Sequence, residues 1–502
     1  MAELLLSNAR VVTMDPACPS AQAVLARAGR IVRVGADAAC RRAASAGARV
    51  IDCCGMVVLP GFIDPHLHLL AWAAALRAVD CTDARSIDEI VRRIRERAAD
   101  LPPGTWVRAV GYDESRLAEG RHPTRWDLDA ATTAHPVRLV HRSGHALVLN
   151  SRALALAGIT VASEEPPGGV IDRRLSDGEP TGLLLEMNEV VARAVPPLPR
   201  AELVAGLREA GKRLLAAGIT AVQDLSHTNG PDAANVLAAL ARESGFAPRL
   251  LPPAEGWPGD AAALSGDVAR PIKVMLRETG ERPVPDVAEL AAIVRACHAR
   301  GRAVAVHAVE RRTVTAVVEA FTRAGVRGGE ARHRIEHAGV CPPELARRIA
   351  ALGLIVVSNP VFLAESGDRY LRDVAPADQP YLYDTAGLAA AGVRVAAGSD
   401  APVVSADALA TVRAAVTRTA RSGTVLPGTG LDPERATALV TAAAAHAAGV
   451  EAELGRIAPG LAADLVVLSA EPHRAHARVA MTIIGGEVRW RREPDGEDRA
   501  YW

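Results

Sequence analysis

Aromatic residues, net charge and long hydrophobic runs are all scarce in this 502-residue sequence, and each shortage excludes a class of function. Phe, Trp and Tyr together make up 3% of the chain, and Lys plus Arg equals Asp plus Glu at 58 each. Nucleic-acid binding needs a basic field and often aromatic platforms for the bases, so we expect no nucleic-acid partner. No apolar run reaches about 18 residues without a charge or a turn, so we predict no membrane span.

Cysteines are also few and irregularly placed, which argues against a disulfide framework or a cysteine-based metal site. Their number is odd and no C-x-x-C spacing of the metal-binding type occurs among positions 18, 40, 53, 54, 81, 297 and 341. The segment Met1–Leu6 has neither the basic part nor the long apolar part of a signal peptide. We therefore expect a reducing, cytoplasmic location.

The middle of the chain alternates apolar strands with amphipathic helices. Helical patterns at 201–217, 286–300, 310–324 and 342–352 each end near a glycine, as helices commonly do. Eight strands are predicted, at 57–64, 219–225, 248–253, 271–276, 303–308, 334–338, 354–359 and 393–399. Eight such alternations predict an α/β protein with a (β/α)8 TIM barrel over residues 57–451.

Two further parts of the chain do not fit the barrel repeat. About 150 residues separate the first predicted strand from the second, where a short loop and one helix suffice, so residues of about 73–200 form an insertion. Both chain ends, residues 1–56 and 452–502, are rich in short strands separated by Gly, Asp and Pro. We expect these ends to form one small composite β-sandwich domain.

Metal-ligating residue types recur where the predicted strands end. In a barrel the carboxyl ends of all strands converge on one site. The residues at these ends are His66, His68, Lys273, His307, His337 and Asp400. Imidazole and carboxylate ligands suit Zn²⁺ and other first-row ions. An ammonium group cannot ligate a cation, so Lys273 serves only after its amine takes up CO₂; from the residues alone, an ordinary strand lysine is the simpler interpretation.

Three motifs carry a family resemblance: Pro60–His68, Ile335–Ala338 and Gly398–Val403. They resemble the amidohydrolase superfamily. Further segments resemble its N-substituted formamide deformylase-like (YtcJ-like) hydrolases, namely Gly111–Glu114, Ser143–Ala146, Asn150–Leu154, Pro180–Glu186 and Gly455–Leu465.

The resemblance implies a hydrolase that cleaves a non-peptide C–N bond of the amide, formamide or N-acyl type with a metal-activated hydroxide. It implies one or two Zn²⁺ ions, two being favoured, with N-carboxylated Lys273 as bridging ligand and Glu186 as the rival bridge. Asp400 is expected to move the proton, and His145 to donate a hydrogen bond to the substrate. Asp64 is expected to orient a ligand imidazole, and Glu336 to point away from the ligands.

The residues alone leave two alternatives to this function open. A deaminase of ring amidines needs only one metal, held by the first-strand histidines, His307 and Asp400. A non-catalytic barrel subunit is disfavoured because every ligand position is retained. A small molecule is the expected substrate and a homodimer is expected by family analogy. No substrate is predicted, because Lys273 lacks the following Asp-Gly pair and Leu382–Thr385 lacks the arginine common in relatives.

Overall fold

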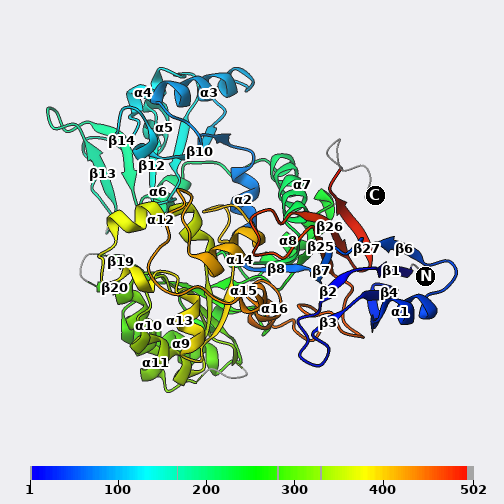
Figure 1. Cartoon of the computed structure of the whole chain (residues 1–502). Helices are drawn as coiled ribbons and strands as arrows, with labels where there is room; N and C mark the ends of the chain where they lie inside the picture. Colours follow the sequence, from blue (N-terminus) through cyan, green and yellow to red (C-terminus); the bar gives the residue numbers. More distant parts are fainter. Residues whose placement is uncertain (1–2, 167, 280–281, 328–330, 494–502) are drawn as a thin grey trace. The chain divides into compact units, whose positions relative to one another are not determined.

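The computed structural model describes residues 3–166, 168–279, 282–327 and 331–493. The chain divides into two compact units, which are described separately (Figure 1). Unit 1 comprises Met1–Leu69 and Gly211–Trp502, and unit 2 comprises Leu70–Ala210.

The two ends of the chain form two β-sheets in unit 1. The first has the order β5-β4-β1-β6 and the second the order β27-β26-β25-β7-β2-β3. The blue N-terminal and red C-terminal strands therefore lie side by side in Figure 1. Their bounds are β1 (Glu3–Ser7), β2 (Arg10–Val12), β3 (Ser20–Ala21), β4 (Ala23–Arg27), β5 (Arg30–Gly35), β6 (Arg49–Asp52), β7 (Val57–Pro60), β25 (Leu465–Leu468), β26 (Val479–Ile484) and β27 (Glu487–Arg491).

One apolar core joins these two sheets. Leu4 and Val24 from the first sheet pack in the same cluster as Val58, Leu465 and Met481 from the second. Helix α1 (Asp37–Ala43) lies against β1, β4 and β5. Both chain ends thus form short strands, as their sequence pattern predicts.

Parallel strands make up the rest of unit 1. They form a three-stranded sheet, β16-β15-β8, and a six-stranded sheet, β17-β18-β21-β22-β23-β24, in which neighbours follow the chain order. Beyond β24, Asp400 N–H donates to His66 O and His68 N–H donates to Ala401 O, both at 2.8 Å, so this segment runs beside β8. The strands are β8 (Phe62–Leu67), β15 (Ile219–Asp224), β16 (Arg249–Leu250), β17 (Glu255–Gly256), β18 (Ile272–Met275), β21 (Val304–Ala308), β22 (Arg334–His337), β23 (Ile355–Ser358) and β24 (Arg394–Ala397).

Two predicted strands are divided in the structure. The predicted strand at 57–64 is in fact β7 in a terminal sheet followed by β8 in a parallel sheet, with the change at Gly61. A Cβ at Gly61 would lie 2.3 Å from Thr220 Oγ1, so only glycine fits at this crossing. Of the predicted strand at 248–253 only β16 forms, and a second short strand, β17, follows Pro252-Pro253, because proline donates no backbone hydrogen bond.

Helices follow most parallel strands, close to their predicted ranges. In α10 the buried Val314, Val317 and Phe321 recur at helical spacing, and Gly325 ends the helix at φ +67°. A ribbon of β19 (Arg277–Thr279) and β20 (Arg282–Val284) precedes α9. The helices are α7 (Arg200–Ala216), α8 (Ala233–Ser244), α9 (Val287–His298), α10 (Arg311–Ala324), α11 (Pro343–Leu352), α12 (Val361–Asp373), α13 (Thr385–Ala390), α14 (Ala408–Thr417), α15 (Pro433–Ala438) and α16 (Ala442–Ala448).

Unit 2 contains a six-stranded sheet of its own, with the order β13-β14-β12-β11-β10-β9. Strands β13 and β14 are antiparallel neighbours, with Asp177-Gly178 in their connection. Its elements are α2 (Leu69–Ala75), β9 (Val79–Asp80), α3 (Ile87–Ala99), β10 (Val107–Tyr112), α4 (Arg125–Asp129), β11 (Val137–His141), β12 (Ala146–Leu149), α5 (Ser151–Leu156), β13 (Val170–Arg173), β14 (Pro180–Leu185) and α6 (Asn188–Ala192).

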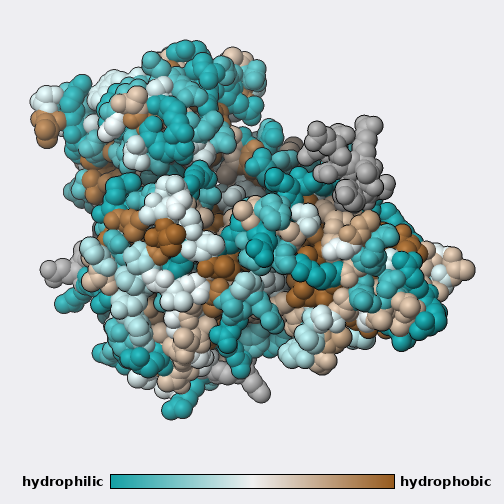
Figure 2. All heavy atoms as spheres, in the orientation of Figure 1, coloured by the Kyte–Doolittle hydropathy of each residue, from teal (hydrophilic) through white to brown (hydrophobic). Residues whose placement is uncertain are grey.

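Hydrophobic side chains are mostly buried in these cores. Figure 2 shows a face on which hydrophilic residues predominate and hydrophobic ones form small separate groups. Within the described ranges, no helix combines the length and the apolar character that crossing a bilayer requires.

Candidate metal centre

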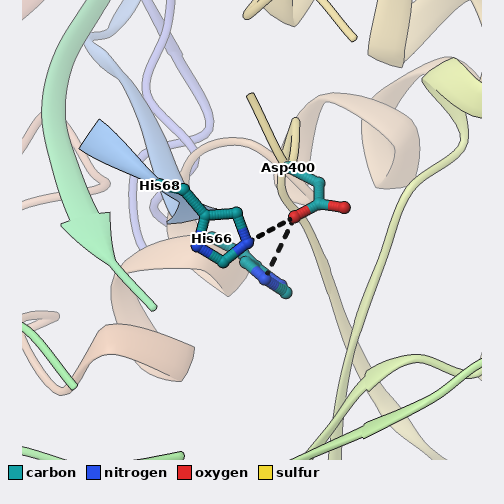
Figure 3. Close-up of side chains that lie close together, drawn as sticks. All are labelled: His66, His68 and Asp400. Carbon is teal, nitrogen blue, oxygen red and sulfur yellow. Dashed lines mark ion pairs between the residues drawn. The ribbon is translucent and has the colours of Figure 1, made fainter. Parts of the chain in front are cut away.

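Three of the predicted ligands converge on one point in unit 1. Asp400 Oδ1 lies 3.0 Å from His68 Nε2 and 3.4 Å from His66 Nε2 (Figure 3). The His66 side chain is fully buried, that of Asp400 is 10% exposed and that of His68 is 23% exposed. Solvent therefore reaches these three side chains from the side of His68 and not from the side of His66.

Local backbone geometry brings these three side chains together. His66 is the penultimate residue of β8 and His68 follows the strand, so two imidazoles two residues apart point toward the same region. Asp400 follows β24 with φ +62°. Gly398, just before it, passes so close to β8 that a Cβ would lie 2.7 Å from His66 Cβ. The Gly398-Ser399-Asp400 motif thus needs a glycine first.

The remaining predicted histidines lie beside this group. His337 ends β22, and its ring centroid is 5.0 Å from that of His66 and 4.6 Å from that of His307 on β21. Lys273 on the adjacent strand β18 is 1% exposed. Its Nζ makes no hydrogen bond with the residues that the structure describes.

Each of three imidazoles has a polar side chain beside its other ring nitrogen, at ion-pair distance for His66 and at hydrogen-bond distance for His337 and His68. His66 Nδ1 lies 2.6 Å from Glu336 Oε2, His337 Nδ1 lies 2.7 Å from Asn359 Oδ1, and His68 Nδ1 lies 3.1 Å from Ser226 Oγ. These contacts leave Nε2 of each ring for a shared ligand, the arrangement that metal-binding histidines usually have.

The contact to His66 corrects two expectations. Asp64 Oδ1 accepts the backbone N–H of His66 at 3.2 Å and of Ser399 at 3.1 Å, so it fixes main chain rather than the imidazole. The imidazole partner is Glu336, which was expected to point away from the ligands. Glu336 is in turn bound by the buried guanidinium of Arg334, which also donates to Pro65 O at 2.8 Å. The spacing Arg334-x-Glu336 places both side chains on one face of β22 and could have signalled their own pairing, but it does not signal the contact to His66.

The electrostatics favour a cation at the centre. Burial lowers the pKa of His66 to about 3 and also lowers the pKa values of His307 and His337, so these rings are neutral at ordinary pH. Burial alone would raise the pKa of Asp400, but His68 and His66 hold it below its usual range. Burial lowers the pKa of the Lys273 ammonium group.

The polar atoms at this centre that lack hydrogen bonds fit a divalent metal ion. His66 Nε2 and Asp400 Oδ1 are shielded from solvent, and neither makes a hydrogen bond of acceptable geometry with the described residues. Buried polar atoms without hydrogen bonds cost about 1–3 kcal/mol each. A cation ligated by these nitrogen and oxygen atoms satisfies both.

The other two predicted site residues contact each other in unit 2. His145 Nδ1 lies 2.7 Å from Glu186 Oε1, and the side chains are 71% and 50% exposed. Glu186 has φ +53° directly after β14. Their predicted roles, hydrogen-bond donor and rival bridging ligand, stay predictions.

Known proteins resemble this chain over nearly its whole length. Residues 49–489 match the model of the amidohydrolase family. The N-substituted formamide deformylase of Arthrobacter pascens is 30% identical, covering 98% of this chain and 99% of the relative. The putative amidohydrolase YtcJ of Bacillus subtilis is 29% identical, covering 86% of this chain and 89% of the relative.

Solved structures share the fold. An uncharacterized metal-dependent hydrolase from Pyrococcus horikoshii superposes with a TM-score of 0.73 at 22% identity, covering 94% of this chain and 98% of the other. This likeness shows the α/β fold. The family match and the two relatives show that the chain belongs to the amidohydrolase family, as a YtcJ-like hydrolase of non-peptide carbon–nitrogen bonds.

Proposed function

We propose that this protein hydrolyses an amide-type C–N bond of a small molecule, such as a formamide or another N-acyl amine, with a metal-activated water. The observation that carries the proposal is the convergence of His66 Nε2, His68 Nε2 and Asp400 Oδ1 on one buried point. The relative from Arthrobacter pascens, by its name a deformylase of N-substituted formamides, supports this bond type.

The proposed architecture is a closed (β/α)8 barrel over residues 57–451 that carries the insertion at about 73–200. The backbone hydrogen bonds between β8 and the segment after β24 support closure. The two terminal sheets, which contain β7 as well as strands from 1–56 and 452–502, are proposed to be a β-sandwich, supported by their common apolar core. A cytoplasmic location is part of the same proposal.

Zn²⁺ is the proposed ion, held by His66, His68 and Asp400, with His307 and His337 as ligands of a second ion. Two ions are favoured over one because five donors and a buried lysine gather at this face. A bound Zn²⁺ supplies a water of lowered pKa and polarises the scissile carbonyl group.

Lys273 is proposed to carry CO₂ as an N-carboxylate that bridges the ions. Reaction with CO₂ requires the neutral amine, and burial of Lys273 lowers the pKa of its ammonium group toward that form. The N-carboxylate would also give the buried Nζ end the partners that it lacks among the described residues.

Asp400 is proposed to carry the proton through the reaction. Its carboxylate accepts a proton from the attacking water as the oxygen bonds to the carbonyl carbon. It then donates that proton to the amine nitrogen as the C–N bond breaks, so one water and one amide yield one acid and one amine. Its pKa, held low by His68 and His66 against the effect of burial, keeps it ionised before attack.

Replacement of Asp400 with Asn tests this function directly. We expect hydrolysis of a panel of N-formyl and N-acyl amines to fall about 10²–10⁴-fold, because proton transfer by a positioned group is worth that much. Activity at the wild-type level in the Asp400→Asn protein would exclude the mechanism. Ammonia release from ring amidines with one metal per chain would instead establish the deaminase alternative.

Replacement of Lys273 with Ala tests the bridge, and the chain offers a matched control. Lysine occurs only twice in the sequence, and the other, Lys212, is exposed on α7. We expect Lys273→Ala to lose one metal per chain and the ¹³CO₂-derived carbamate signal in NMR, and Lys212→Ala to keep both. An unchanged two-metal content in Lys273→Ala would remove lysine from the site.

A further inference from the structure

Unit 2 carries a second group of metal-type ligands at one edge of its own sheet. Strands β10 and β11 are parallel neighbours, with Val110 paired to Val140, so their carboxyl ends emerge at the same edge. His141 ends β11, and Asp113 and Glu114 follow directly after β10. Two carboxylates and one imidazole thus meet at this edge.

A β-bulge sets their relative positions. The pairing shifts between Val110 and Tyr112, so that Tyr112 rather than Gly111 lies opposite His141. Gly111 has φ +89°, and a Cβ there would lie 2.5 Å from Thr82 Oγ1. The bulge therefore requires glycine. Because the bulge adds one residue to β10, Asp113 and Glu114 lie one residue closer to the level of His141 than regular pairing would place them.

The ligand atoms are close, shielded and not hydrogen-bonded to one another. One ligand atom from each of Asp113, Glu114 and His141 lies within 4.8 Å of the other two. Glu114 Oε2 and His141 Nε2 are 2.8 Å apart and shielded from solvent, yet neither makes a hydrogen bond of acceptable geometry with the described residues. The His141 side chain is 10% exposed. This is the arrangement of two ligands of a common cation.

The centre in unit 1 has the same features. There too, an imidazole Nε2 and a carboxylate oxygen, those of His66 and Asp400, are shielded, 3.4 Å apart and without a hydrogen bond of acceptable geometry. Across the part of the chain that the structure describes, these are the two places where three metal-type ligand atoms come so close.

The surroundings fix the orientation of the His141 ring. The Ser143 backbone N–H donates to His141 Nδ1 at 3.2 Å, and Ser143 Oγ lies 2.8 Å from the same nitrogen, so Nε2 faces Glu114. The rings of Tyr112 and His122 enclose the imidazole, with centroids 5.1 and 5.8 Å away. Arg142 Nε lies 3.6 Å from Asp113 Oδ2, and its positive charge offsets the negative charge of that carboxylate.

We propose that Asp113, Glu114 and His141 bind one divalent transition-metal ion of the Zn²⁺ type in unit 2. One nitrogen and two carboxylate oxygens suit this class of ion, and a water completes a tetrahedral set. The ion links the carboxyl ends of β10 and β11 and so stabilises unit 2. This proposal concerns the ligands of the metal centre assigned to the proposed function only in that both are metal sites. No residue is shared between them, so an experiment that disproves one proposal leaves the other untouched.

The test uses the full chain with the proposed ligands of both unit 1 ions removed, by His66→Ala, His68→Ala, His307→Ala, His337→Ala and Asp400→Ala together. After chelator treatment and dialysis against Co²⁺, we expect about one Co²⁺ per chain, a visible absorption band of a nitrogen–oxygen site, and a raised thermal midpoint. Adding Glu114→Gln or His141→Ala should reduce all three signals to background. Adding Glu96→Gln, an exposed glutamate on α3, should leave them unchanged.

Absence of Co²⁺ in the folded five-site variant would overturn the proposal. So would weak binding that Glu114→Gln and His141→Ala leave unchanged, because that describes an adventitious ion only. If the five-site variant does not fold, the same comparison is made in the otherwise wild-type chain. There His141→Asn should lower the metal content by one ion per chain, and an unchanged content would overturn the proposal.

Discussion

At the scale of single residues, the contacts that hold the imidazoles are as specific as the ligands themselves. Glu336, Asn359 and Ser226 come from three different parallel strands or their ends, and each contacts one ring nitrogen. Motif spacing predicted the candidate ligands, because histidines at strand ends can converge on one point. It could not identify Glu336 as the partner of His66, because that contact crosses from β22 in one parallel sheet to β8 in the other.

Replacement of Glu336 with Gln should weaken metal binding about 10–100-fold, the usual effect of losing a carboxylate that orients a ligand histidine. The amide still accepts from His66 Nδ1, but it no longer raises the basicity of the ring. Competition with a chromogenic chelator measures the affinity. Because the change also leaves the buried Arg334 without its carboxylate, unfolding in denaturant should show a loss of about 3–5 kcal/mol.

Ser226→Ala provides the control for that experiment, since it removes an uncharged partner of His68 and leaves Arg334 and Glu336 paired. We expect a smaller loss of metal affinity and little change in stability. Equal metal affinity in Glu336→Gln and wild type would mean that the contact to His66 has no part in binding.

At the scale of elements, the crossing at Gly61 joins two sheets that the sequence pattern presented as one strand. Helix ends were predictable because a helix that ends in the left-handed conformation favours glycine whatever surrounds it, as at Gly325 and Gly353. The division between β7 and β8 depends instead on which strands pair with each half, and Val57–Leu67 is apolar enough for either sheet.

Gly61→Ala should lower the free energy of unfolding by about 1–3 kcal/mol, the range for overpacking, because its Cβ meets Thr220 Oγ1 and Cγ2 at 2.3 and 2.4 Å. The double variant Gly61→Ala/Thr220→Ser should recover part of that loss, because serine lacks Cγ2. Gly47→Ala, where no atom lies within 4 Å of the added Cβ, is the matched control. Denaturant unfolding measures all four proteins, and no rescue by Thr220→Ser would exclude this clash as the cause.

A buried histidine ties the start of β22 to β21 and makes the fold sensitive to acid. His333 Nδ1 accepts the backbone N–H of Val304 at 3.0 Å, and its Nε2 lies 3.1 Å from His298 Nδ1. Burial, with a smaller effect of His298, lowers the pKa of His333 from 6.5 to about 4. The unfolded chain therefore binds a proton between pH 6.5 and 4 that the folded chain does not.

Stability should accordingly be constant above pH 6.5 with respect to this group and fall by about 3 kcal/mol as the pH drops to 4. His333→Gln should flatten this part of the stability–pH curve, and the exposed His476→Gln should not. Urea unfolding at half-unit pH steps measures the slopes. A slope in His333→Gln equal to that of wild type would exclude His333 as the sensitive group.

At the scale of the whole molecule, the α/β class and the YtcJ-like family were predictable, whereas the internal arrangement of unit 2 was not. The parallel strands can be recognised in the sequence as apolar runs that end in residues of metal-ligating types. In unit 2, by contrast, parallel β10 and β11 stand next to antiparallel β12 and β14. Nothing local in a strand such as Val137–His141 specifies which neighbour it pairs with, so Asp113, Glu114 and His141 could not be grouped from their spacing.

Removal of metal should destabilise the whole protein, because an ion that binds only the folded state stabilises it by about 2.7 kcal/mol at 100 times its dissociation constant. Chelator treatment should lower the thermal midpoint by a few degrees, and added Zn²⁺ should restore it. Differential scanning calorimetry measures both steps. The same midpoint with and without chelator in a protein shown to have lost its metal would exclude metal as part of the fold.

The strand order of the second terminal sheet has a consequence for how the protein is made. β7 pairs with β2 on one side and with β25 on the other, and β25 is the first of the last three strands of the chain. At about 5–20 residues per second, a ribosome needs roughly 20–80 s to pass from one partner to the other. Throughout that interval one edge of β7 lacks its neighbour, while every parallel strand is being synthesised. A chain interrupted before Leu465 would keep this open edge, which exposes Val57–Leu59 for pairing with another nascent chain.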